Sequence, residues 1–151
     1  MTSDDIEIVQ RAWSRISLFS NEFVKEIYRE LFRLDPGLLP MFTMTDERLI
    51  NKVAQTLNTV LTSLEQLDAL RFIIRHLGQQ HRRYGVKPEH FALVKLAMTR
   101  VMAQRLGEHF TPTLAQAWSA AYDEIAAIMI EGLQQEPRAE EPADMALPWL
   151  C

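Results

Sequence analysis

The sequence predicts an all-α fold, and three observations support this prediction. Apolar residues recur at helical spacings of three and four along almost the whole chain. No stretch alternates apolar and polar residues between turn residues, as half-buried strands do. The chain has 5 glycines, which leaves few tight turns. At 151 residues, 48% of them hydrophobic, it is long enough to bury the core of one domain.

Two helices are predicted before the first proline. The first is capped by Thr2 or Ser3 and carries acidic residues in its first turn, where the helix dipole favours negative charge. Its apolar face consists of Ile6, Val9, Trp13 and Ile16. Ser20 is expected to cap a second helix over roughly 21–35, which Pro36 ends. The inward stripe of this second helix is Val24, Tyr28 and Leu31.

The next segment, 36–44, contains two prolines and allows only a short helical turn. Phe42 lies just beyond the second proline. Thr45 is expected to cap a third long helix, whose apolar face runs from Leu49 to Leu64. This helix therefore follows a proline-bounded turn that ends near a phenylalanine.

An imidazole interrupts the apolar face of the fourth predicted helix. The helix starts near Asp68 and ends at Tyr84-Gly85, glycine being the usual residue past a helix C-terminus. Its face consists of Leu70, Ile74, Leu77, His81 and Tyr84. A buried neutral imidazole needs a partner, and a metal ion is one of the partners that it suits best. His81 is therefore a candidate metal ligand.

Two further helices and a tail complete the chain. Pro88 suits the first turn of a helix that ends at Leu106, and Thr111 with the proline after it begins the last helix. The segment 136–151 contains three prolines and four acidic residues. We therefore expect a folded domain over 1–135 and an acidic, proline-rich, flexible tail over 136–151.

Charge and cysteine content exclude several classes of function. The formal net charge of −4 argues against a nucleic-acid-binding protein, which usually has a strong basic excess. Cys151 is the single cysteine, so no intramolecular disulfide can form. The chain shows no signal peptide and no apolar run of about 18 residues, as a membrane span would need. These features predict a cytoplasmic protein without a membrane span.

Three segments carry a resemblance to a known family. They are IYRELFRLDPGLLPMF (27–42), HRRYGVKPEHF (81–91) and AWSAAYDEIAAIMI (117–130), and the similarity spans roughly 4–133. In this order they resemble the globins, most closely the bacterial single-domain globins, which are similar to the haem domain of flavohaemoglobins. The resemblance implies a globin fold, a helical sandwich around a haem pocket that holds haem b (iron protoporphyrin IX).

The resemblance also assigns the site residues. His81 matches the proximal haem ligand, Phe42 the phenylalanine on the haem face, and Tyr28 the distal tyrosine that stabilises a bound gas. A backbone carbonyl near Leu77 is expected to fix the His81 tautomer. The other residues expected around the haem are Leu49, Lys52, Val53, Leu77, Tyr84, Val86, Phe91 and Val94.

The chain departs from the family pattern at several of these positions. Leu49 stands where many members have glutamine or histidine, which leaves Tyr28 as the distal donor. Lys52 is expected to be solvated or paired with a haem propionate. Phe91 replaces a tyrosine that, with a glutamate, polarises the proximal histidine, and Glu131 is two residues out of register for that glutamate.

Other chemistry-bearing side chains have simpler interpretations. His76 and His90 fall off the apolar stripe that carries His81 and are expected at the surface. Met98, Met102 and Met129 have helical spacing and are expected to fill the core.

The implied function is reversible binding of dioxygen, nitric oxide, carbon monoxide and similar gases. It would serve oxygen handling or transport, or the dioxygenation of nitric oxide with an external reductase, since no flavin domain follows. One alternative is a haem-based gas or redox sensor that signals through helix or tail movement. Another is an interaction module that has the globin fold and no haem.

Overall fold

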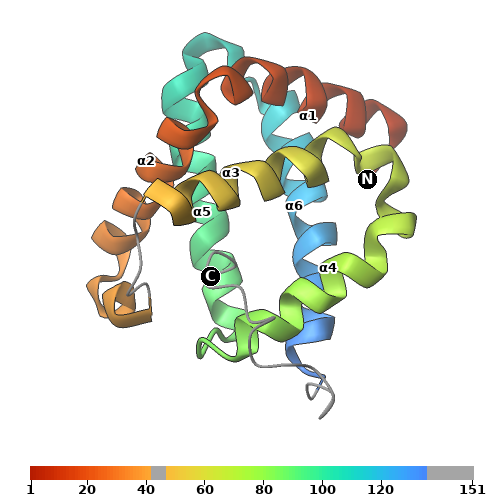
Figure 1. The fold of residues 1–151 in the computed structure, drawn as a ribbon. Coiled ribbons are helices and arrows are strands. Elements are labelled where there is room, and N and C mark those ends of the chain that lie inside the picture. Colours follow the sequence, from red (N-terminus) through yellow and green to blue (C-terminus); the bar gives the residue numbers. More distant parts are fainter. Residues whose placement is uncertain (42–46, 136–151) are drawn as a thin grey trace.

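The computed structural model describes residues 1–41 and 47–135, which form six α-helices and no strand (Figure 1). The all-α prediction is confirmed for this part of the chain. The α-helices are α1 (Ser3–Ile16), α2 (Ser20–Leu34), α3 (Glu47–Thr62), α4 (Leu67–Arg82), α5 (Pro88–Leu106) and α6 (Pro112–Leu133). The 3-10 helices are η1 (Ser17–Phe19), η2 (Pro36–Met41), η3 (Leu64–Gln66) and η4 (Gly107–His109). No helix within these ranges is long and apolar enough to cross a membrane.

Most helix ends follow the sequence signals. At α1 the cap is Thr2, whose Oγ1 accepts a hydrogen bond from the Asp5 N–H at 3.1 Å, while Asp5 Oδ2 accepts one from the Thr2 N–H at 2.8 Å. This reciprocal pair satisfies two N–H groups at the start of the helix. At α6, Thr111 Oγ1 accepts from the Leu114 N–H at 3.2 Å. Pro88 occupies the first turn of α5, as predicted.

Two boundary predictions are wrong. Ser20 is the first residue of α2 rather than its cap, because η1 leads directly into the helix and Ser20 already has helical backbone angles, φ −62° and ψ −37°. A cap needs a non-helical backbone. Leu64 lies in η3 rather than α3, which ends at Thr62. The predicted cap Thr45 and the predicted tail over 136–151 lie outside the described residues.

Helix α4 crosses α6 at backbone contact. A Cβ atom added to Gly78 would overlap the Met129 carbonyl oxygen, and one added to Gly132 would overlap the Arg75 carbonyl oxygen. Glu131 on α6 also forms ion pairs with Arg75 and Arg71 of α4, at 2.7 and 3.0 Å. The two glycines therefore set how closely α4, which carries His81, approaches α6.

Ion pairs connect α2 to α5. Glu30 on α2 accepts from Arg100 on α5 at 3.1 Å and from Arg33, one turn further along its own helix. The Arg33 hydrogen bond, helped by the one from Arg100, lowers the pKa of Glu30 to about 2. The ionised form of Glu30 is therefore favoured in the folded protein.

The Glu30 cluster predicts a specific loss of stability in acid. Because the folded pKa lies below the ordinary value of 4.5, the stabilisation is complete above pH 4.5 and is lost as the pH falls towards 2. We expect Glu30→Gln to lower the free energy of unfolding at about pH 7, and the difference from wild type to shrink at about pH 3. Urea denaturation at both pH values measures this, and an equal difference at the two would contradict it.

Candidate functional site

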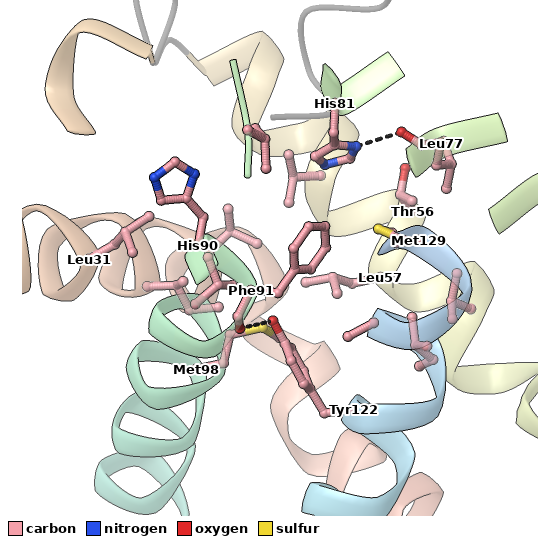
Figure 2. A pocket seen from close by; sticks show the side chains of 18 of the residues that line it. Leu31, Thr56, Leu57, Leu77, His81, His90, Phe91, Met98, Tyr122 and Met129 are labelled. Atoms are coloured by element: carbon pink, nitrogen blue, oxygen red, sulfur yellow. Dashed lines mark hydrogen bonds between the residues drawn. The ribbon is translucent and has the colours of Figure 1, made fainter. Parts of the chain in front are cut away.

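An apolar cavity of about 220 Å³ lies among α2, α3, α4, α5 and α6 (Figure 2). Aliphatic and aromatic side chains form most of its wall. The cavity thus combines a largely apolar interior with a few polar groups, as small-molecule sites usually do. Its polar lining side chains are Tyr28, Thr56, His81, His90, Trp118 and Tyr122.

The structure brings together most of the site residues that the sequence predicted. Helix α3 faces the cavity with Val53 and with residues one and two turns further on, and Leu49 is buried one turn before this wall. Tyr84 lies past the end of α4 and does not line the cavity. Phe42 lies outside the described residues. The predicted residues that line the cavity are Tyr28, Val53, Leu77, His81, Val86, Phe91 and Val94.

Lys52 lies at a different cavity. It is exposed and, with Gln55, lines a second cavity of about 290 Å³ between α3 and α4. Adjacent helical residues point about 100° apart, so Lys52 and its neighbour Val53 face different sides. The two cavities share the side chains of Thr56, Val60 and Leu77.

The His81 ring is held in one tautomer. Its Nδ1 lies 2.6 Å from the Leu77 carbonyl oxygen, which can only accept, so Nδ1 carries the proton and donates it. The predicted carbonyl partner is thereby confirmed. Burial lowers the pKa of His81, and the Leu77 hydrogen bond opposes this shift. Burial therefore favours the neutral ring, whose Nε2 lone pair can bind a metal ion.

The surroundings of this imidazole are apolar. The Phe91 ring lies beside it, with a centroid separation of 6.3 Å, and Met129 also lines the cavity (Figure 2). Glu131 does not reach this wall and forms ion pairs with arginines of α4. It follows Met129 by two helical positions, which correspond to a rotation of about 200° around α6. Helix α6 thus contributes Met129 to this wall, and no carboxylate is among the described lining residues.

The methionines have the roles that the sequence suggested. Met98 and Met102 belong to the buried core, as predicted. Met98 also reaches the cavity, and Met129 is partly buried at the cavity wall. Met102 therefore fills the core, and Met98 and Met129 form part of the cavity wall.

Several lining residues were not assigned to the site by the sequence reasoning, and Tyr122 and His90 are two with polar side chains. Tyr122 lines the cavity, and its hydroxyl donates to the Phe91 carbonyl at 2.6 Å. Burial raises the pKa of this phenol above its ordinary value. His90, expected at the surface, is half-buried and also lines the cavity, and its Nδ1 accepts from the Lys87 N–H at 2.9 Å. Its place in the first turn of α5, two residues after Pro88, was the signal that could have found it.

His76 was expected at the surface. It is half-buried, and its ring nitrogen Nε2 lies 3.2 Å from the buried Gln80 amide nitrogen, one turn along α4. It does not line the cavity. Of the two histidines on α4, His81 is therefore the one that faces the site.

Comparison with known proteins identifies the family. The globin family model matches residues 25–129. The chain belongs to the globin family. This confirms the resemblance and the predicted globin fold, and globins bind haem.

Individual relatives support this assignment. The globin is 27% identical to a neuroglobin from Tetraodon nigroviridis, covering 95% of this chain and 98% of the relative. It is 29% identical to a flavohemoprotein from Bacillus subtilis, over 91% of this chain but 36% of the longer relative. Among solved structures, it resembles the engineered carbene transferase RmaNOD from Rhodothermus marinus, with a TM-score of 0.80 and 28% identity, over 88% and 93% of the two chains.

The described residues fit a haem group. The porphyrin is a large apolar ring and requires an apolar cavity, and its iron requires an axial ligand such as a neutral imidazole. The cavity supplies both, because His81 enters it with Nδ1 already committed to Leu77. The chain is therefore a haem-binding globin.

Proposed function

We propose that this globin holds haem b through His81 Nε2 and reversibly binds dioxygen and related diatomic gases. The observation that carries the proposal is the neutral, carbonyl-anchored His81 ring in an apolar cavity that Tyr28 also lines. Bound haem would supply an iron centre with one position open for a diatomic gas.

Tyr28 is the side chain that we assign to gas stabilisation. It lies on α2, is 8% exposed, and stacks on Phe32 with a centroid separation of 6.1 Å. A phenol hydroxyl in a dry cavity can donate to a gas that gains negative charge, and the low dielectric strengthens such a hydrogen bond. Tyr28 would therefore slow the escape of dioxygen.

The proximal side favours reversible gas binding over peroxide chemistry. The His81 Nδ1–H is held by a neutral carbonyl, and Phe91 and Met129 beside the cavity present no carboxylate. A carboxylate partner would raise the basicity of the imidazole and its donation to iron. Without one, His81 is suited to reversible ligand binding rather than to peroxide chemistry.

Nitric oxide dioxygenation with an external reductase is the more specific role that we propose. Its support is the similarity to a flavohemoprotein and to RmaNOD, a candidate nitric oxide dioxygenase, although this chain spans 36% of the flavohemoprotein. The single cysteine suits a reducing, cytoplasmic location. Mixing the oxygenated protein with nitric oxide tests the role: rapid nitrate formation supports it, and slow or absent consumption would leave oxygen handling.

Tyr28→Phe should accelerate dioxygen dissociation. The substitution keeps the ring that stacks on Phe32 and removes only the hydroxyl. Loss of a hydrogen bond of about 1.5–3 kcal/mol to a partly charged acceptor predicts a rate about ten to a hundred times faster. Stopped-flow displacement by carbon monoxide measures the rate.

Tyr122→Phe is the matched control for this experiment. It removes another hydroxyl that lines the same cavity, but one that donates to the Phe91 carbonyl. Its dioxygen dissociation rate should stay close to that of wild type. Equal rates for wild type and Tyr28→Phe would show that another group stabilises the gas.

A further inference from the structure

Most polar side chains of the cavity use a hydrogen-bond donor within the protein. Three of them donate within the protein, and a fourth, His81, donates its Nδ1–H to Leu77. A donor that already bonds within the protein is not directed at a bound ligand. The three bonds are Thr56 Oγ1 to Lys52 O at 3.0 Å, Trp118 Nε1 to Thr99 Oγ1 at 3.2 Å, and Tyr122 Oη to Phe91 O at 2.6 Å.

His90 has a different arrangement. Its Nδ1 accepts the Lys87 N–H, and a ring nitrogen that accepts carries no proton. In the neutral ring the proton is therefore on Nε2, at the far end of a side chain that lines the cavity (Figure 2). The hydrogen bond to the backbone fixes the ring, so this N–H is presented in a defined position.

His90 lies where a bound ligand could keep a charged group in contact with water. It is half-buried, while Lys87, Pro88 and Glu89 before it are exposed, so the ring lies where the cavity meets solvent. Haem b carries two carboxylate side chains, and burying a carboxylate without a partner is costly. The carboxylate end of the group therefore belongs at such an edge.

We propose that His90 Nε2–H donates a hydrogen bond to a haem carboxylate and retains the haem in the cavity. The inference rests on the proposed haem site and adds a second attachment point on α5, beside the attachment by His81 on α4. Lys52, which the sequence analysis expected to be solvated or paired with a haem propionate, is exposed and lines the second cavity.

His90→Asn separates this role from the role of His90 at the start of α5. Asparagine Oδ1 can accept the Lys87 N–H in place of Nδ1, but the shorter side chain has no donor at the position of Nε2. We expect haem to transfer to excess apomyoglobin about three to ten times faster than from wild type, as loss of a partly solvated charge-assisted hydrogen bond predicts. His90→Gln, whose amide reaches as far as Nε2, should restore most of the slow transfer. Glu89→Gln, at the exposed neighbour, should leave the rate unchanged.

Haem dimethyl ester is the deciding probe, because its carboxylates are blocked. With this ester, His90→Asn and wild type should lose the group at the same rate. An equal rate with ordinary haem would overturn the inference. So would an acceleration that persists with the ester, since His90 would then act through α5 alone. If wild type bound neither form, the proposed haem site itself would fail, which is a distinguishable result.

Discussion

Replacing His81 by glycine should remove the axial ligand and release haem far faster than from wild type. The ring enters the cavity with Nδ1 bonded to the Leu77 carbonyl, which leaves Nε2 as the metal-binding atom. Losing only an outer partner of a metal ligand typically costs about 10–100-fold, so loss of the ligand itself should exceed about 100-fold in haem affinity. Titration of the apoprotein with haem, followed by the absorbance of the complex, measures the change.

Free imidazole provides the internal check on His81→Gly. The substitution leaves a space the size of the ring, and added imidazole should fill it and restore much of the wild-type spectrum. His76→Ala on the same helix is the control, because His76 does not line the cavity, and it should bind haem as wild type does. A His81→Gly protein with wild-type affinity and spectrum in the absence of imidazole would show that another residue binds the iron.

Gly78→Ala should destabilise the protein, against the usual helical preference for alanine. Alanine in a helix interior is normally favoured over glycine by about 0.5–1 kcal/mol. At Gly78, however, the new Cβ would overlap the Met129 carbonyl oxygen, and backbone cannot move aside as a flexible side chain can. Overpacking of this kind typically costs about 1–3 kcal/mol, so the net sign reverses. Thermal and urea unfolding of the apoprotein measure it.

The same substitution should weaken haem binding, because His81 follows Gly78 by one helical turn. Separating α4 from α6 moves the ligand relative to the α6 side chains that line the cavity, Met129 among them. Gly132→Ala meets the Arg75 carbonyl at the same crossing. The double variant should therefore cost less than the sum of the single ones, since one separation relieves both overlaps.

Phe72→Ala is the control for the α4–α6 crossing. Phe72 lies on α4 but is 73% exposed, so its truncation should change the unfolding free energy by less than about 0.5 kcal/mol. If Gly78→Ala were as stable as wild type, the close crossing would not hold α4 in place.

The sequence predicted the parts of the site that depend on one helix at a time. The spacing of His81 along its apolar stripe placed the imidazole on the inward face, and helical geometry placed the Leu77 carbonyl within its reach. Proline and glycine marked the ends of α5 in the same way. Local signals sufficed for these features because each depends on residues a few positions apart.

Features that depend on packing between helices were not predictable in this way. The close backbone approach at Gly78 and the cavity position of Tyr122 follow from how α6 is rotated and how closely α4 approaches it. His90 was assigned to the surface because its spacing was compared with the stripe of α4, whereas its position is set by the first turn of α5. Leu49 shows the same limit, since the part of α3 that reaches the cavity depends on where the whole helix crosses.

The absorption spectrum of the reduced, gas-free protein after addition of haem tests the central claim most directly. With His81 as the axial ligand and an opposite side open to gas, we expect a strong Soret band and a five-coordinate ferrous spectrum that changes on adding dioxygen or carbon monoxide. Absence of a Soret band would contradict haem binding. A six-coordinate, low-spin ferrous spectrum would contradict the open gas position, because a second side chain would then occupy it.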